Sequence, residues 1–424
     1  MPLGRNYHRL WTASGFSNLA DGVFQIALPL LALRLTRSPA LIAGVQLAAR
    51  LPWLVFALQA GALADRLDRR RTMVLVNVVR VGLIGTVAIL VAFDAAELWL
   101  LYLIAFALGI GETLFDTAAQ SIMPMLVPAD QLSRANGRLY AVELTMNQFV
   151  GPPLGGILAG TAIVLAFAGS AASYLVAAVA LAVIAGNYRA TRRGPPTKLR
   201  TDIAEGLRYL TRHRVLRTFA AMTGMSNMAG NAVFAVFPVF AVGAVSELGL
   251  SEEGYGFLII AGAGGSLVGS FVAERVERLL GKVNTLAVGA IAFGTGLLVP
   301  GLWPSVPVIV VVSMISGFFI VVWNVVTVSL RQRITPPHLL GRMNASYRLL
   351  AWGAIPIGAA IGGALAEVIG IRPMFVVMGL VAMSLAFGRL LVNDADIAAA
   401  EAQAADAAEA REDETASLSS EGPA

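Results

Sequence analysis

The stretch Asp65-Arg66-Leu67-Asp68-Arg69 returns 209 residues later as Glu274-Arg275-Val276-Glu277-Arg278. The same offset relates Ser17-Asn18-Leu19-Ala20 to Ser226-Asn227-Met228-Ala229. A third match, at an offset of 208, joins two sets of four residues: Pro128, Leu132, Arg134 and Asn136, and Pro336, Leu340, Arg342 and Asn344. Three matches in the same order indicate a chain built from two related halves.

The composition indicates that most of this chain faces lipid. Of the 424 residues, 57% are hydrophobic and only 13% are charged, whereas soluble domains carry about 25% charged residues. A soluble chain of this length would need polar surface for two or three domains. The absence of Cys excludes disulfides, thiolate metal sites and Cys catalysis.

Twelve apolar runs approach the length of about 20 residues that a helix needs to cross a bilayer. They fall, six in each half, at 10–34, 40–64, 72–93, 97–122, 139–161, 163–186, 216–244, 253–273, 283–303, 306–330, 344–368 and 371–392. The first run is too long for a signal-peptide core and contains Asp21, so we expect it to be retained. The predicted fold is an all-α membrane protein of twelve transmembrane helices in two pseudo-symmetric six-helix bundles.

The runs divide the chain into four parts. We expect an N-terminal bundle over 1–186, a cytoplasmic basic linker over 187–215, a C-terminal bundle over 216–392, and a disordered acidic tail over 393–424. Within the linker, Ile203, Leu207 and Leu210 share one face of a short helix. Such a helix lies either along the inner membrane surface or free in solvent.

Arginine clusters predict the orientation in the membrane. They follow alternate helices, at 66–71, 134–138, 187–217, 275–282 and 331–342. Under the positive-inside rule both termini are cytoplasmic, and the expected location is the cell inner membrane. These anchors account for the net charge of +5, so nucleic-acid binding is not expected.

Two motifs carry a resemblance to a known family. Gly61-Ala-Leu-Ala-Asp65-Arg66-Leu-Asp68-Arg69-Arg70-Arg71 follows the second run, and Gly151-Pro152-Pro153-Leu154-Gly155-Gly156 lies in the fifth. The chain resembles the major facilitator superfamily, in the exporter branch similar to macrolide-efflux and enterobactin-export proteins. The first motif matches the signature of the loop between helices 2 and 3, and the second the core of a motif associated with antiporters.

The resemblance implies two roles for these motifs. Alternating access would use Gly61, Asp65, Arg66, Asp68 and Arg69, with Asp116, to clamp the loop against the second half. The residues Gly151, Pro152, Gly155 and Gly156 would form an antiporter-like hinge, although Asn147 stands where that motif has its first glycine. A simpler interpretation is that the glycine spacing lets helices pack closely.

Buried charges occur in the first half only. The main candidates for proton coupling are Asp21, Glu112, Arg50 and Arg80, whereas apolar or small residues stand at the equivalent positions of the second half. Each such charge costs roughly 2.5–3.5 kcal/mol on insertion scales, which makes a functional role the default expectation. The hypothesis is that Asp21, with Glu112 second, carries protons. The alternative is two permanent ion pairs, Asp21–Arg50 and Glu112–Arg80, which would leave the cavity locally neutral.

A second set of residues could contact substrate. It combines polar side chains with aromatic ones near mid-membrane: Gln25, Asn227, Asn231, Phe234, Trp323 and Asn324. An apolar cavity with a few polar anchors suits amphipathic organic molecules. Packing is the alternative role for the aromatic members of the set.

The predicted function is export of small amphipathic organic molecules, such as a drug, siderophore or metabolite, in exchange for protons. The alternatives are a proton-coupled uptake symporter, a lipid or lysolipid translocator and, more distantly, a sensor that transports nothing. A nucleotide-driven pump is excluded because no Gly-x4-Gly-Lys-Ser/Thr run exists. His8, His213 and His338 lack metal-ligand spacing. No enzymatic activity, cofactor or metal is therefore expected, and the expected partners of a monomer are substrate, protons and bilayer.

Overall fold

The computed structural model describes residues 3–64, 67–128, 131–186, 188 and 199–404, with side chains left out for 57–64 and for a few other helical residues. Within these residues the chain is helical apart from turns and one isolated β-bridge between Val242 and Leu250. Asp65 and Arg66 of the loop motif lie outside the described residues, as does the segment 405–424.

The described helices follow one another in the order that the apolar runs predict. Those of the first half are α1 (Arg5–Leu35), α2 (Pro39–Ala64), α3 (Arg69–Ala92), α4 (Leu98–Leu126), α5 (Leu132–Leu144), the π-helix η2 (Thr145–Val150) and α6 (Gly151–Ala182). Those of the second half are α7 (Leu199–Arg212), α8 (Arg214–Ala241), α9 (Glu252–Leu280), α10 (Lys282–Leu302), α11 (Val306–Ile334), α12 (Pro337–Ile369), α13 (Ile371–Ser384) and the 3-10 helix η3 (Leu385–Leu390).

Eleven of the described helices are long and apolar enough to cross a membrane. One of these spans, Arg134–Ala182, joins α5, η2 and α6 into one continuous stretch of 49 residues. A straight α-helix of that length would measure about 74 Å, against a hydrocarbon core of about 30 Å. Ala162 interrupts it with extended backbone at φ −161° and ψ 121°. The break falls between the predicted runs 139–161 and 163–186, so this helix supplies two crossings and the predicted twelve are present.

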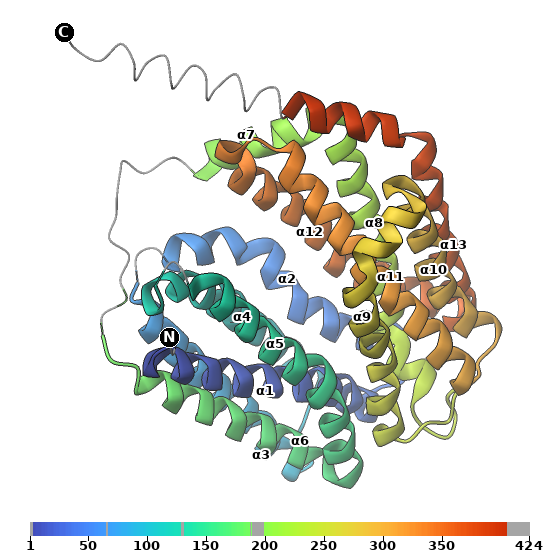
Figure 1. Cartoon of the computed structure of the whole chain (residues 1–424). Helices are drawn as coiled ribbons and strands as arrows, with labels where there is room; N and C mark the ends of the chain where they lie inside the picture. Colours follow the sequence, from blue (N-terminus) through green and yellow to red (C-terminus); the bar gives the residue numbers. More distant parts are fainter. Residues whose placement is uncertain (1–2, 65–66, 129–130, 187, 189–198, 405–424) are drawn as a thin grey trace.

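The helices gather into two groups (Figure 1). Helices α1 to α6, drawn blue to green, lie together, and α7 to α13, drawn light green to red, lie beside them. Contacts between the groups run mainly along α2 against α12 and α6 against α9. Both pairs join a helix of one sequence half to a helix of the other, which is the arrangement expected of two repeats related by an axis along the membrane normal.

Glycines make the closest contacts within each group. A Cβ at Gly151 would lie 2.6 Å from the Cα of Gly22, and one at Gly155 would lie 2.9 Å from the carbonyl oxygen of Val23. The same contacts recur in the second group, where Gly358 meets Met228 and Gly362 meets Ala232, both on α8. Close helix packing at these glycines is therefore confirmed.

The neighbouring glycines face the opposite group. A Cβ at Gly156 would lie 2.7 Å from the carbonyl oxygen of Glu252 on α9. A Cβ at Gly363, the repeat equivalent of Gly156, would lie 2.6 Å from the Cβ of Ala43 on α2. One helix in each half thus carries two glycine faces, one for its own group and one for the other.

The linker helix α7 is docked on protein. Leu210 is fully buried, and the Tyr209 hydroxyl donates to the carbonyl oxygen of Ile334 at 3.0 Å. A Cβ at Gly206 would lie 2.3 Å from the carbonyl oxygen of Arg342, so α7 rests directly against α12. The predicted helix is present, and the face that carries Leu210 meets the second group.

The start of the predicted disordered tail is ordered, which corrects that expectation for residues 394–404. These residues are helical, with Ile397 only 1% exposed. Glu401 pairs with the Lys282 ammonium at 2.6 Å, and the Asp394 carboxylate accepts from the backbone N–H of Val283 at 3.2 Å. The acidic residues that suggested disorder are the ones that dock this helix on the basic end of α10.

We predict that Gly156→Ala will loosen the contact between α6 and α9. The added Cβ would overlap backbone atoms, which cannot swing away as a flexible side chain could. Because the chain has no Cys, a single Ser266→Cys reporter can be labelled with an impermeant maleimide added on the side that carries Arg34. Labelling should become several-fold faster in the Gly156→Ala background.

The matched control is Gly137→Ala, since a Cβ at Gly137 meets nothing within 4 Å. It should leave the labelling rate unchanged. Equal labelling rates in the Gly156→Ala and Gly137→Ala backgrounds would show that the Gly156 contact does not limit access to residue 266 from the side that carries Arg34.

Candidate functional site

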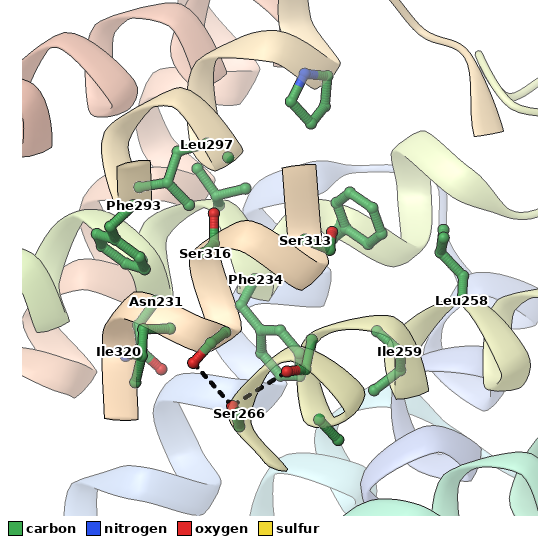
Figure 2. A pocket seen from close by; sticks show the side chains of 18 of the residues that line it. Asn231, Phe234, Leu258, Ile259, Ser266, Phe293, Leu297, Ser313, Ser316 and Ile320 are labelled. Carbon is green, nitrogen blue, oxygen red and sulfur yellow. Dashed lines mark hydrogen bonds between the residues drawn. The ribbon is translucent and has the colours of Figure 1, made fainter. Parts of the chain in front are cut away.

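A cavity of about 530 Å³ lies between the two groups of helices. Its polar lining residues come from α1, α2, η2, α8, α9 and α11: Gln25, Gln46, Arg50, Gln148, Ser226, Asn227, Asn231, Ser266, Ser313 and Ser316. Phe234, Phe237 and Phe293 supply aromatic faces, and Figure 2 shows Phe234 and Phe293 beside Asn231 and the serines. The volume and the mixed lining fit an organic molecule of drug size.

The structure places all six predicted substrate residues on cavity walls. Gln25, Asn227, Asn231 and Phe234 line the main cavity. Trp323 and Asn324 line an adjoining cavity of about 110 Å³. The two cavities share Ser226, Asn227, Phe293 and Ile320, so they form one continuous region on the side of the second bundle.

Several lining residues were missed from the sequence. Gln46 lies four residues before Arg50, and therefore on the same face of α2. That spacing was a usable signal. Gln148 lies in the π-helix η2, where five residues separate bonded groups, so an α-helical face does not predict its direction.

Polar contacts join the two bundles at the end that carries Arg34. The Arg34 guanidinium binds both carboxylate oxygens of Glu252, at 2.8 and 3.0 Å. Its Nη2 also donates to the carbonyl oxygen of Ala159 at 3.3 Å. Where α2 meets α12, the second contact between the bundles, the Ser38 hydroxyl donates to the Glu367 carboxylate at 2.9 Å. This end is closed, because Glu252 joins α9 to α1 and Glu367 joins α12 to the start of α2.

Arg80 lies at the centre of the first bundle, and only 2% of its side chain is exposed. Its guanidinium is 3.7 Å from the Asp21 carboxylate and donates to the Ser17 hydroxyl at 3.3 Å. The guanidinium carbon also lies 5.5 and 5.1 Å from the ring centres of Phe115 and Tyr174. The Tyr174 hydroxyl donates to Asp21, so this ion pair is enclosed by aromatic and hydroxyl groups.

A second ion pair faces the cavity. The Arg50 guanidinium is 3.3 Å from the Glu112 carboxylate, and about a third of each side chain is exposed (35% and 33%). Arg50 is also a lining residue of the cavity. This pair is therefore partly open to solvent, and its Arg50 side borders the cavity.

The observed pairing corrects the one expected from the sequence, which joined Asp21 to Arg50 and Glu112 to Arg80. The reason is helix adjacency. α2 packs against α4, which brings Arg50 to Glu112, and α3 packs against α6, which brings Arg80 to Tyr174 and so to Asp21. The neighbours of each helix, on which the pairing depends, were not predicted from the sequence.

Asp116 lies on α4, one turn after Glu112. Its expected contact with Arg66 of the loop motif lies outside the described residues. Its charge interacts with those of Glu112, Asp21 and Arg80. From the second bundle, Arg348 on α12 also lies near enough for its charge to interact with that of Asp116.

The described residues of the loop motif fix the start of α3 and tie it to the end of α6. Asp68 is the N-cap of α3, and its carboxylate accepts from the backbone N–H groups of Arg71 at 2.9 Å and Tyr188 at 3.0 Å. Arg70 donates to the carbonyl oxygens of Leu181 and Ala182 at the end of α6. A clamp by Asp65 and Arg66 lies outside the described residues. Gly61 lies within α2, and Arg69 is the first residue of α3.

These contacts set the ionisation of Asp68. Burial by itself raises the pKa of its carboxyl group. The hydrogen bonds from Arg71 and Tyr188 and the charges of Arg71 and Arg70 outweigh burial and lower the pKa below its ordinary value. The ionised Asp68 carboxylate therefore stabilises the folded protein. This contribution to the free energy of unfolding is complete above the ordinary Asp pKa of about 3.9, and it is lost as the pH falls through the lowered pKa.

Comparisons with known proteins agree with this architecture. A family model described as transmembrane secretion effector matches residues 2–421. The chain belongs to this family of the major facilitator superfamily. It is a membrane transporter and not an enzyme, and the resemblance drawn from the sequence motifs is confirmed.

Curated relatives match over most of their length. The multidrug efflux pump Tap of Mycolicibacterium fortuitum is 26% identical over 380 residues, covering 85% of this chain and 89% of Tap. Macrolide efflux protein A of Streptococcus pyogenes is 22% identical over 406 residues, covering 92% and 96% of the two chains.

Solved transporters share the fold. A mutant of the nucleoside transporter NupG superposes with a TM-score of 0.73 at 10% identity, covering 92% of this chain and all of NupG. A bacterial homologue of the human lysosomal transporter Spinster, inward-facing and unoccupied, gives a TM-score of 0.68 at 15% identity, covering 92% and 97%. The predicted twelve-helix fold is confirmed.

We predict that Asp68→Ala will lower stability by about 1–2 kcal/mol at neutral pH, because an N-cap and a tie to Tyr188 are lost together. The measurement is thermal unfolding of the purified protein in detergent. Asp68→Asn is the matched variant, since Asn also caps helices but has no charge. It should fall between wild type and Asp68→Ala, and equal melting temperatures for all three would contradict the assigned role.

Proposed function

We propose that the protein exports amphipathic organic molecules across the cell inner membrane by alternating access, in exchange for protons, with both termini in the cytoplasm. The observation that carries the proposal is the Arg50–Glu112 pair in the wall of a cavity between two bundles. Such a pair can respond to substrate on one side and to protons on the other. The names of the efflux relatives support the direction of transport.

The closed end supports an inward-facing state. With Arg34–Glu252 and Ser38–Glu367 joined, the cavity is sealed at the end that the positive-inside rule assigns to the outside. Export then requires these contacts to open while the bundles close at their other end. The glycine seams along α6–α9 and α2–α12 provide the surfaces on which one bundle rocks against the other.

We propose Glu112 as the group that exchanges protons with the cavity. A carboxylate that is a third exposed can lose its proton to water, and protonation removes the attraction that holds Arg50. Asp21, enclosed with Arg80 and Tyr174, then responds through the shared charge cluster. A proton moving down a membrane potential of 100 mV supplies about 2.3 kcal/mol, and each pH unit adds about 1.4.

The test uses inverted membrane vesicles acidified inside, with rhodamine 6G as a transported probe and a pH dye in the lumen. We expect addition of rhodamine 6G to release luminal protons in wild-type vesicles. Glu112→Gln and Asp21→Asn should each abolish this release. Glu97→Gln, at an exposed glutamate outside the cluster, is the matched control and should behave as wild type.

Proton release that persists in both Glu112→Gln and Asp21→Asn would contradict proton coupling at these groups. The two ion pairs, Arg50–Glu112 and Arg80–Asp21, would then only stabilise the first bundle. Uptake of probe by right-side-out vesicles instead of inverted ones would favour a symporter. Movement of a headgroup-labelled lipid without movement of the dye would favour a lipid translocator.

A further inference from the structure

The second bundle lines the cavities with polar groups but without charge. Among the described lining residues, those of α8 to α11 include serines and asparagines but no Asp, Glu, Lys, Arg or His. The charged lining residue, Arg50, comes from α2 and is paired with Glu112. Recognition by this wall therefore depends on hydrogen bonds and apolar contact.

The two asparagines of α8 direct their amide nitrogens to the protein. Nδ2 of Asn231 donates to the carbonyl oxygen of Asn227 at 2.9 Å, and Nδ2 of Asn227 donates to the carbonyl oxygen of Ala351 at 2.7 Å. A backbone carbonyl only accepts, so the atom that faces it must be the nitrogen. Each amide keeps one N–H, but both lone pairs of its Oδ1 remain.

Two of the four serine hydroxyls that line the cavity, those of Ser266 and Ser316, also bond within the protein. The Ser266 hydroxyl lies 3.0 Å from the carbonyl oxygens of Gly262 and Gly317, as the dashed lines in Figure 2 show. The Ser316 hydroxyl donates to the carbonyl oxygen of Ala292 at 3.2 Å. Each hydroxyl that donates to a carbonyl retains lone pairs but no proton for a ligand.

The adjoining cavity repeats the pattern. Nδ2 of Asn324 donates to the carbonyl oxygen of Ile320 at 3.1 Å. The indole N–H of Trp323 donates to the Thr223 hydroxyl at 3.4 Å. Acceptors thus outnumber free donors among five side chains of this wall. We name this set the acceptor wall and define it by Asn227, Asn231, Ser266, Ser316 and Asn324.

We infer that the acceptor wall selects amphipathic substrates that present N–H or O–H groups, an inference that rests on the proposed export function and specifies its substrate class. A donor on the ligand finds an oxygen lone pair. A ligand acceptor turned to this wall meets fewer partners, since each asparagine offers one remaining N–H against two oxygen lone pairs. It therefore regains less of the hydrogen bonding that it loses with water, which is unfavourable. Phe234, Phe237 and Phe293 receive the apolar body of the same molecule.

The experiment compares two dyes with the same xanthene core, ethyl ester and single positive charge. Rhodamine 6G carries two N–H groups, whereas tetramethylrhodamine ethyl ester carries none. Binding is measured by fluorescence anisotropy on the purified full-length protein in lipid nanodiscs, without a gradient. We expect rhodamine 6G to bind roughly five- to tenfold more tightly, because one net hydrogen bond contributes about 1 kcal/mol.

Two variants assign the preference to the wall. Asn231→Leu should abolish the preference by weakening rhodamine 6G binding while leaving the other dye unchanged. Phe293→Leu, which alters only the apolar contact, should weaken both dyes equally. If Asn231→Leu fails to fold, the comparison of the two dyes on wild-type protein still tests the inference.

Three results would overturn the inference: equal affinities on wild-type protein, no binding of rhodamine 6G, or equal weakening of both dyes by Asn231→Leu. Because binding is measured without a gradient, this outcome is independent of the vesicle experiment. Dye movement without a donor preference would leave the exporter and remove the acceptor wall. A donor preference without dye movement would support the acceptor wall and contradict the proposed export.

Discussion

Backbone contact at glycine is the constraint on which the rest of this structure depends. Lipid is as apolar as the helix surfaces, so little hydrophobic driving force brings transmembrane helices together, and close packing must supply the attraction. Gly151 and Gly155 bring α6 onto α1, while Gly156 brings the same helix onto α9. Gly358, Gly362 and Gly363 do the same for α12 against α8 and α2. The cavity exists because these two helices serve both bundles at one end.

The charges follow a different rule from the packing. The glycine faces occur in both halves, whereas the Arg50–Glu112 and Arg80–Asp21 pairs occur in the first half alone. The two pairs also differ in exposure, since Arg80 is 2% exposed and Arg50 is 35% exposed. A shared scaffold thus holds one bundle with interior ion pairs and another whose described cavity lining is polar but uncharged.

Periodic and compositional features could be predicted from the sequence because they are local. The helix spans, the repeat and the glycine spacing need only a count of apolar or small residues, and the boundary near 162 coincides with the break at Ala162. The ion-pair partners could not be predicted, because they depend on which helices are neighbours. The order of the helix at 394–404 depends on contacts with Lys282 and Val283, which are distant in sequence.

The helix at 394–404 has a mechanical consequence. Glu401 lies within 4 Å of both Lys282 and Arg333, and Asp396 lies 3.7 Å from Arg214. A single short segment therefore bridges the ends of α8, α10 and α11. These contacts couple the ends of the three helices, so the tail segment acts as a brace across one end of the second bundle.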